Sequence, residues 1–168
     1  MTSFNFFQSL NLWLHLISLA LWIGGISFFL FVFAPGVHSL PAGPAIRALD
    51  RGRRSLQTLS WIAINLILVT GVFNLVVRGV ATGFRFGPGY YPILAIKLFL
   101  FLAMVFHHCL QAFKYAPHLA ALTARTALDI QSWPEPLLSH WTKWFTLLKI
   151  NTALGPIVLF LGLALARS

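Results

Sequence analysis

Acidic side chains are scarce in this chain of 168 residues. Only three residues are Asp or Glu, and charged residues of both signs make up 9% of the sequence. A soluble globular protein carries about 25% charged residues, because its surface must face water. Apolar residues supply 58% of this chain, and the mean hydropathy is +0.82. The sequence therefore excludes an ordinary soluble domain, and we expect the lipid bilayer to be its solvent.

The sequence also has little sulfur. A single cysteine, Cys109, excludes an intramolecular disulfide and any cysteine-based metal cluster. The two methionines include the initiator, which excludes a methionine-rich path for soft metal ions. The three carboxylates fall outside the apolar stretches of the chain, which disfavours hydrolysis or proton pumping by Asp or Glu inside a membrane.

Four apolar stretches are long enough to cross a bilayer. A hydrocarbon core about 30 Å thick requires about 20 mostly apolar residues in a helix. Such stretches run over about 12–33, 59–77, 93–113 and 144–166, and Pro and Gly mark the loops between them. No internal repeat is evident. The sequence predicts one all-α transmembrane domain, a bundle of four antiparallel transmembrane helices.

The basic residues are distributed unequally between the two sides of this predicted bundle. Lys and Arg exceed Asp and Glu by nine charges. Three basic residues lie on the side of the termini and the second loop, and seven lie in the first and third loops: Arg47, Arg51, Arg53, Arg54, Lys114, Arg125 and Lys143. Because short cytoplasmic loops are enriched in Lys and Arg, we expect these two loops to be cytoplasmic and both termini outside. The charge thus encodes topology, and we do not expect nucleic acid binding.

Polar residues inside the predicted spans are functional candidates, because they are costly to bury in lipid. At a rise of 1.5 Å per residue they fall into two layers, each about 5 to 9 Å from the midplane. The outer layer contains His15, Asn74 and Lys97, and the inner layer contains Asn65, His107, His108, Lys149 and Asn151. We interpret the three asparagines as hydrogen-bonding links between helices.

This sorting restricts the ways in which histidines could hold one iron. His15 and His108 differ by about 16 Å in predicted depth, so they are not expected to ligate the same iron. His107 and His108 point about 100° apart on a helix, so only one of them can face the bundle centre. A second ligand could come from the loop histidines His38, His118 and His140.

Three further features have structural interpretations. Residues 44–60 form an amphipathic stretch, which we interpret as a surface helix lying on anionic headgroups. Gly24 and Gly25 are expected to permit close helix approach, and the mid-depth Trp22 is expected to pack in the core. Most other large polar aromatics fit the interfacial belts of a membrane protein: Trp13, Trp61, Tyr90, Tyr91, Trp133, Trp141 and Trp144.

The first span resembles the opening helix of the copper-resistance protein D (CopD) family. Residues 13–35 contain a His, then a Trp followed closely by a Gly pair, and end in Ala-Pro. The resemblance continues through 53–79, 95–105 and 147–165, and so covers nearly the whole chain. CopD-type domains are associated with copper handling across the inner membrane. The resemblance implies a multi-pass protein of a bacterial-type inner membrane.

A related four-helix family, the HemJ-type protoporphyrinogen oxidases, is similar at three positions. It has an early His in the first helix, a Lys near the start of the third and a His near its end. These positions correspond to His15, Lys97 and His108. The resemblance implies b haem and oxidation of protoporphyrinogen, although the chain has no Asn-Glu-x-Pro run before its last helix.

Together these features predict a CopD-like membrane protein that holds a redox cofactor. The candidate binding residues are His15, Lys97, His107 and His108, with His15 and His108 as metal ligands. We favour b haem over copper, because a Cu(I) path usually needs thiolate or thioether ligands. Electrons would pass between a membrane quinone or porphyrin and a partner at one face, and a second copy or a larger complex could complete the iron site. Copper transport, HemJ-like oxidation and a cofactor-free accessory subunit of a larger membrane complex stay open as alternatives.

Overall fold

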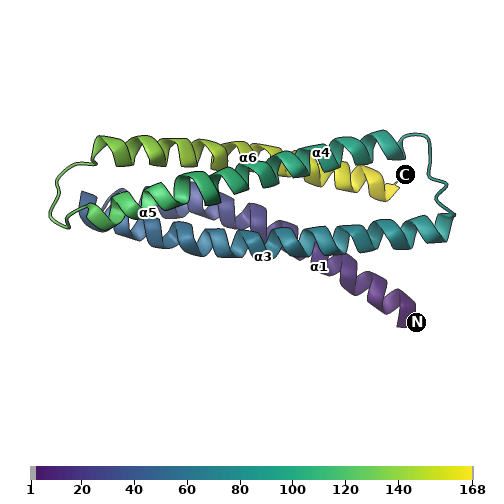
Figure 1. Cartoon of the computed structure of the whole chain (residues 1–168). Coiled ribbons are helices and arrows are strands. Elements are labelled where there is room, and N and C mark those ends of the chain that lie inside the picture. Colours follow the sequence, from purple (N-terminus) through teal and green to yellow (C-terminus); the bar gives the residue numbers. More distant parts are fainter. Residues whose placement is uncertain (1–2, 168) are drawn as a thin grey trace.

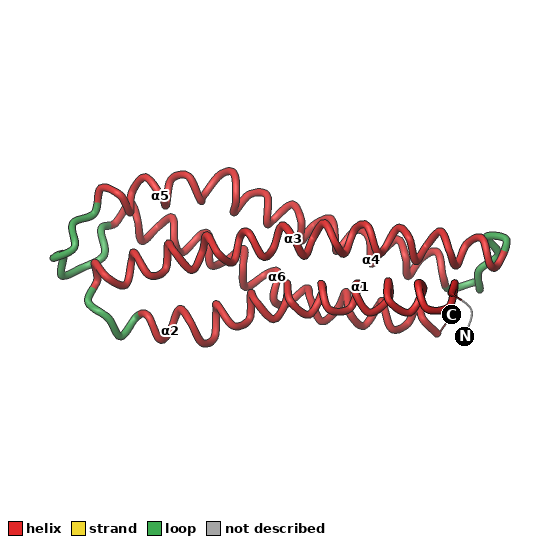
Figure 2. Tube along the Cα trace, turned by 90° about the horizontal axis from the view of Figure 1, so that it is seen from below, coloured by secondary structure: helices red, strands yellow, loops and turns green. Residues whose placement is uncertain are grey.

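The chain folds into four long helical rods that run antiparallel to one another (Figure 1). The computed structural model describes residues 3–167, and its side chains are described over residues 6–165. Every regular element in that range is a helix, and loops 38–41, 83–89 and 126–134 join the rods (Figure 2). The predicted all-α bundle of four helices is confirmed.

The rods are longer than the apolar stretches that predicted them. They are α1 (Ser3–Phe28) with η1 (Phe29–Phe33) and α2 (Ala34–Val37); α3 (Ala42–Thr82); α4 (Tyr90–Cys109) with η2 (Leu110–Tyr115) and α5 (Ala116–Arg125); and α6 (Glu135–Arg167). All four are long and apolar enough to cross a membrane, as expected of a multi-pass membrane protein. The 41 residues of α3 span about 60 Å, twice the thickness of the hydrocarbon core. Part of the bundle therefore extends beyond the lipid.

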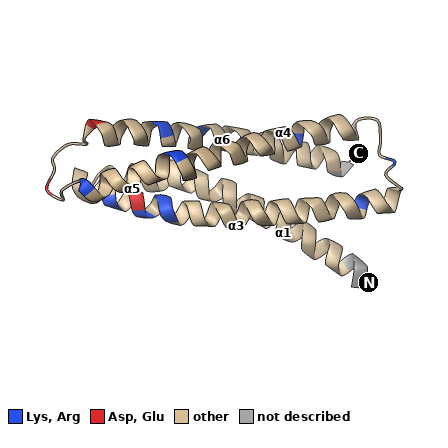
Figure 3. Cartoon of the chain, viewed as in Figure 1, with Lys and Arg blue, Asp and Glu red and all other residues tan. Residues whose placement is uncertain are grey.

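The two ends of the bundle differ in charge. Both termini and loop 83–89 lie at one end, which we call the terminal end (Figure 1). Loops 38–41 and 126–134 lie at the other, which we call the basic end because most Lys and Arg residues gather toward it (Figure 3). The placement of the termini beside the middle loop agrees with the predicted topology, and the cytoplasmic location of the basic end remains a prediction.

Residues 44–60 do not form a separate surface helix, so that interpretation was wrong. They are the straight N-terminal part of α3 (Figure 1). Their apolar face is covered by protein instead of lipid, since Ala45, Ile46 and Leu49 are at most 1% exposed. The stretch thus extends the bundle past the predicted hydrocarbon boundary at Leu59, with Arg47, Arg51 and Arg54 exposed and Arg53 buried.

The core is thickest toward the basic end, where aromatic rings interlock. Phe29 packs edge-to-face on Trp144, and Trp144 packs in the same way on Trp141. Trp141, Trp144 and Tyr90 are at most 4% exposed, so their assignment to interfacial belts was wrong. Composition alone does not distinguish aromatics of the interfacial belt from aromatics of the protein core, because a helix that continues past the membrane still buries aromatics in protein. Trp13, which is 57% exposed, agrees with the belt assignment.

The core thins toward the terminal end. α1 packs mainly on α3, and α4 packs mainly on α6, so the bundle consists of two helical hairpins. No residue from 91 to 100 of α4 is buried, and Gly79 is the only buried residue from 71 to 85. The terminal half therefore leaves polar side chains half-buried between loosely packed helices.

Two π-helical turns, η1 and η2, interrupt the first and third rods. Each is followed by an Ala-Pro step, Ala34-Pro35 in the first rod and Ala116-Pro117 in the third. A proline ring within a helix clashes with the carbonyl four residues earlier. A preceding turn with i→i+5 hydrogen bonds moves that carbonyl away, so the rod continues past the proline.

Only one of the two neighbouring glycines in α1 permits a close contact. A Cβ on Gly25 would lie 3.2 Å from Leu59 Cδ2, whereas one on Gly24 would meet no atom within 4 Å. The prediction of close approach therefore holds for Gly25 and was wrong for Gly24. A tighter approach occurs at Gly155, where a Cβ would lie 2.6 Å from Ile23 Cδ1.

Candidate functional site

His15 lies in a polar cluster between α1 and α3 in the terminal half of the bundle. Its Nδ1 lies 2.8 Å from Thr70 Oγ1. One turn toward the terminal end, Asn11 donates to Thr70 O at 3.1 Å and to Asn74 Oδ1 at 2.9 Å. The four side chains connect the two helices of the first hairpin, and Asn74 serves as the interhelical link that was predicted.

The hydrogen bonds of Thr70 determine which nitrogen of His15 carries a proton. The Thr70 hydroxyl donates to Leu66 O, so its oxygen accepts from His15 Nδ1–H. In the neutral imidazole, Nε2 then has a free lone pair. A histidine that donates through one nitrogen and is unprotonated at the other has the arrangement of a metal ligand with an outer hydrogen-bond partner.

Lys97 of α4 is the charged side chain that acts electrostatically on this histidine. Its ammonium is close enough to His15 for the two groups to interact electrostatically. Lys97 is half-buried and packs toward α6, where a Cβ on Gly162 would lie 3.2 Å from its Nζ. The structure therefore places His15 and Lys97, two of the three positions that the HemJ resemblance indicated, within electrostatic range of each other.

The third position, His108, lies apart from them, closer to the basic end. Its ring packs edge-on against Trp61, nine residues before Thr70 on α3. That offset corresponds to about 13 Å along the helix. His15 and His108 accordingly contact α3 at well-separated levels, in keeping with the two layers expected from the sequence.

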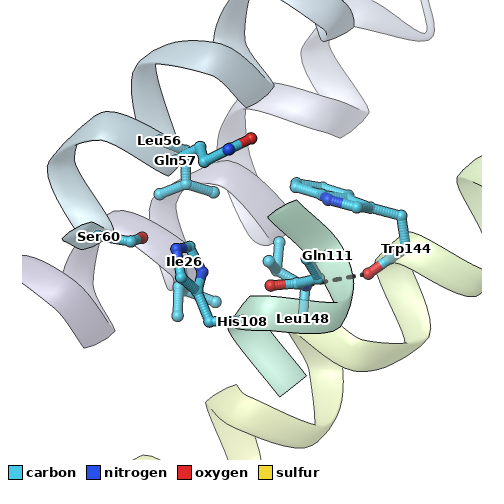
Figure 4. Close-up of a pocket in the computed structure, with 8 residues that line it drawn as sticks. All are labelled: Ile26, Leu56, Gln57, Ser60, His108, Gln111, Trp144 and Leu148. Carbon is cyan, nitrogen blue, oxygen red and sulfur yellow. Dashed lines mark hydrogen bonds between the residues drawn. The ribbon is translucent and has the colours of Figure 1, made fainter. Parts of the chain in front are cut away.

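His108 faces a small cavity (Figure 4). The cavity has a volume of about 10 Å³ and lies between α1, α3, η2 and α6. His108 Nε2 is buried without a hydrogen-bond partner, and Gln111, one turn further along the same rod, donates to Trp144 O at 3.2 Å. A cavity of this size has room for about one water molecule. It does not fit a haem.

His107 points away from this cavity, as expected for its neighbour on the same helix. Asn151 Nδ2 of α6 donates to Met104 O at 3.2 Å, so its Oδ1 accepts from His107 Nδ1 at 3.0 Å. Asn151 is fully buried and links α6 to α4 as predicted. His107 thus has a structural partner that occupies one ring nitrogen.

The other sequence candidates do not join a site. Lys149 is exposed on α6, and the exposed Asn65 bonds only to Trp61 O of its own helix, so its interpretation as an interhelical link was wrong. His118 and His140 stack at 5.3 Å at the basic end. Over residues 3–167 no three His, Cys, Asp or Glu side chains lie together as metal ligands.

Sequence reasoning missed Asn11 and the role of Thr70. Thr70 and Asn74 are one turn apart on α3, and Asn11 and His15 are one turn apart on α1. Polar residues at this spacing share a helix face, which was the available signal. Whether the polar face of α1 meets the polar face of α3 depends on the register between the two helices. The sequence of neither segment alone determines that register.

Comparisons with protein-family models, with curated proteins and with solved structures find no match to this chain.

Proposed function

We propose that this chain is a membrane redox protein that holds b haem through His15. The observation that carries the proposal is the hydrogen bond from His15 Nδ1 to Thr70, which leaves Nε2 unprotonated in the neutral imidazole. Haem iron takes a neutral imidazole nitrogen as an axial ligand. When bound, haem supplies one-electron oxidation and reduction.

The residues around His15 fit such a group. Thr70 fixes the ring orientation and the tautomer of His15. Lys97 supplies a positive charge that would balance the carboxylates of a porphyrin. Gly71 leaves the edge of the His15 ring uncrowded, since a Cβ there would lie 3.3 Å from Cε1. The thin core of the terminal half is where a planar group could replace lipid between the hairpins.

Copper fits these residues less well. A lone imidazole near a lysine ammonium offers one ligand and a repelling charge, and the described residues contain no group of three His, Cys, Asp or Glu side chains that could hold a metal ion. Thiolate and thioether ligands favoured by Cu(I) are scarce in the chain. The electron partner we propose is a quinone or porphyrin dissolved in the membrane, and a second copy or another subunit could provide the other axial ligand.

The proposal is tested by an absorption spectrum and metal analysis of the detergent-purified protein. We expect a Soret band and about one iron per site in the wild type, and loss of both in His15→Ala. His118→Ala, at the basic end, is the matched control and should retain them. His108→Ala should also retain the band, because its cavity is too small for a haem.

The outcomes separate the alternatives. A wild-type protein without a Soret band and without iron would contradict the proposal and favour a cofactor-free accessory subunit. Bound copper that is lost in His15→Ala would favour copper transport. Loss of haem in His108→Ala with retention in His15→Ala would move the site to the inner layer.

A further inference from the structure

A groove at the basic end lies between α3 and α5, far from His15. We call it the arginine groove. Its volume is about 310 Å³, and its walls are Arg47, Asp50, Arg51 and Arg54 of α3 with Thr123 and two alanines of α5. The small alanines leave the space open opposite the arginines. The proposed haem site explains none of these residues.

The charges of the arginine groove are not balanced within it. Asp50 is engaged by two arginines, Arg53 at 2.6 Å and Arg54 at 3.1 Å. Arg51 has no ion-pair partner in the described part of the chain, and Arg47 only reaches Thr126 O at 3.5 Å. The lining residues therefore have an excess of two positive charges, with guanidinium donors still available for a ligand.

Thr123 provides an independent indication of a ligand. Its side chain lines the groove and is 7% exposed, and its Oγ1 is buried without a hydrogen-bond partner. Buried hydroxyls are nearly always hydrogen-bonded, so an unpaired one beside free guanidinium groups indicates a missing acceptor. The acceptor must be anionic to suit the arginines.

We propose that the arginine groove binds a phosphate group. Guanidinium groups bind phosphate oxygens in pairs through charge-assisted hydrogen bonds. Arg47 and Arg51 supply these donors, and the Thr123 hydroxyl donates to a further oxygen. Arg54 compensates the negative charge of Asp50 in the groove wall, because it pairs with the carboxylate that would otherwise repel the ligand.

The position of the groove suits two sources of the phosphate group. Arg54 lies five residues before the predicted hydrocarbon boundary at Leu59, or about 8 Å along the helix, which is the depth of lipid headgroups. Arg47 lies farther out, in water. The same chemistry thus suits the headgroup of phosphatidic acid and a free phosphate ion, and experiment can separate these two sources.

The test is ligand-dependent thermal stabilisation of the full chain in detergent at constant ionic strength. One arm adds phosphatidic acid, a second adds inorganic phosphate, and a third adds chloride as the reference. A ligand that binds only the folded state raises Tm with concentration. Arg51→Gln and Thr123→Val each remove one hydrogen-bond donor from the groove. Arg85→Gln, in the exposed loop at the terminal end, is the control, because it removes the same charge outside the groove.

We expect Tm to rise in the wild type and in Arg85→Gln. Arg51→Gln and Thr123→Val should require about tenfold more ligand for the same rise, since each loses a hydrogen bond to a charged group. Thr123→Val should not lower Tm without ligand, because its hydroxyl has no partner to lose. A response to phosphatidic acid alone assigns the site to lipid, and a response to inorganic phosphate assigns it to a free ion. No response above chloride, or equal responses in all four proteins, would overturn the proposal.

Discussion

At the scale of single residues, the least expected feature is a charge buried in the basic end. Arg53 is 3% exposed, and its guanidinium contacts Asp50 and Gln57. Asp50 is the only acidic residue within the described helices of the first hairpin. Its carboxylate compensates the buried Arg53 and also pairs with the exposed Arg54. The two ion pairs therefore share a carboxylate and differ in burial.

We predict that Asp50→Asn lowers the free energy of unfolding by about 3 kcal/mol, because it leaves Arg53 buried without an opposite charge. Arg54→Gln breaks only the exposed pair and should cost less than about 1 kcal/mol. Denaturant unfolding in detergent, followed by circular dichroism, measures both. Equal costs for the two variants would contradict the assigned difference between the pairs.

At the scale of elements, the π-helical turn of the first rod packs closely against α3. Gly52 of α3 lies against the π turn η1, and a Cβ there would collide with the ring of Phe33. The same Cβ would lie 3.1 Å from Phe29, which is itself packed on Trp144. The aromatic core and the path of the first rod thus require a residue without a side chain at position 52.

We predict that Gly52→Ala destabilises the protein by about 1 to 3 kcal/mol through overpacking against the two phenylalanine rings. Gly24→Ala is the control, because it places a methyl group in open space on an exposed helix face. It should be neutral or stabilising by up to about 1 kcal/mol, the helix propensity of Ala over Gly. Thermal unfolding of both variants in the same detergent provides the comparison, and a larger loss in Gly24→Ala would refute the packing argument.

The elements also show what the sequence could predict. The four apolar stretches were sufficient to predict the four membrane-spanning helices, because the length and hydropathy of a segment can be read from that segment alone. The extension of α3 was missed because arginines interrupt residues 44–60, while Ile46 and Leu49 are buried by helices far away in sequence. The two layers of histidines followed from helix rise alone. The bond between His15 and Thr70 depends on helix register, which periodicity does not determine.

At the scale of the whole molecule, four antiparallel rods place both termini at one end. Loop 38–41 lies at the opposite end from loop 83–89 (Figure 1). The greater number of Lys and Arg residues in the first and third loops predicts that loop 38–41 faces the cytoplasm. The fold places the two loops at opposite ends of the bundle, and the distribution of Lys and Arg predicts which end faces the cytoplasm.

We predict opposite labelling of cysteines placed in these two loops. In a Cys109→Ala background, Ser39→Cys should react with an impermeant maleimide only in inside-out vesicles, because its loop is predicted to be cytoplasmic. Arg85→Cys should react only in right-side-out vesicles. Reversed labelling would contradict the predicted orientation alone. Labelling of both from the same side would contradict the four crossings.

The two Ala-Pro steps allow the hairpins to be compared position by position. Pro35 and Pro117 are 82 residues apart, and His15 and Lys97 each lie 20 residues before their proline. The same shift superposes three pairs of buried positions: Trp22 with Met104, Ile26 with His108, and Phe29 with Gln111. The first and third rods thus share the spacing of several buried positions before their Ala-Pro steps. The imidazole of His15 in the first rod and the ammonium of Lys97 in the third rod lie at equivalent positions along their rods. The shared spacing of the two rods thus places two chemically different side chains, a histidine and a lysine, at matching positions.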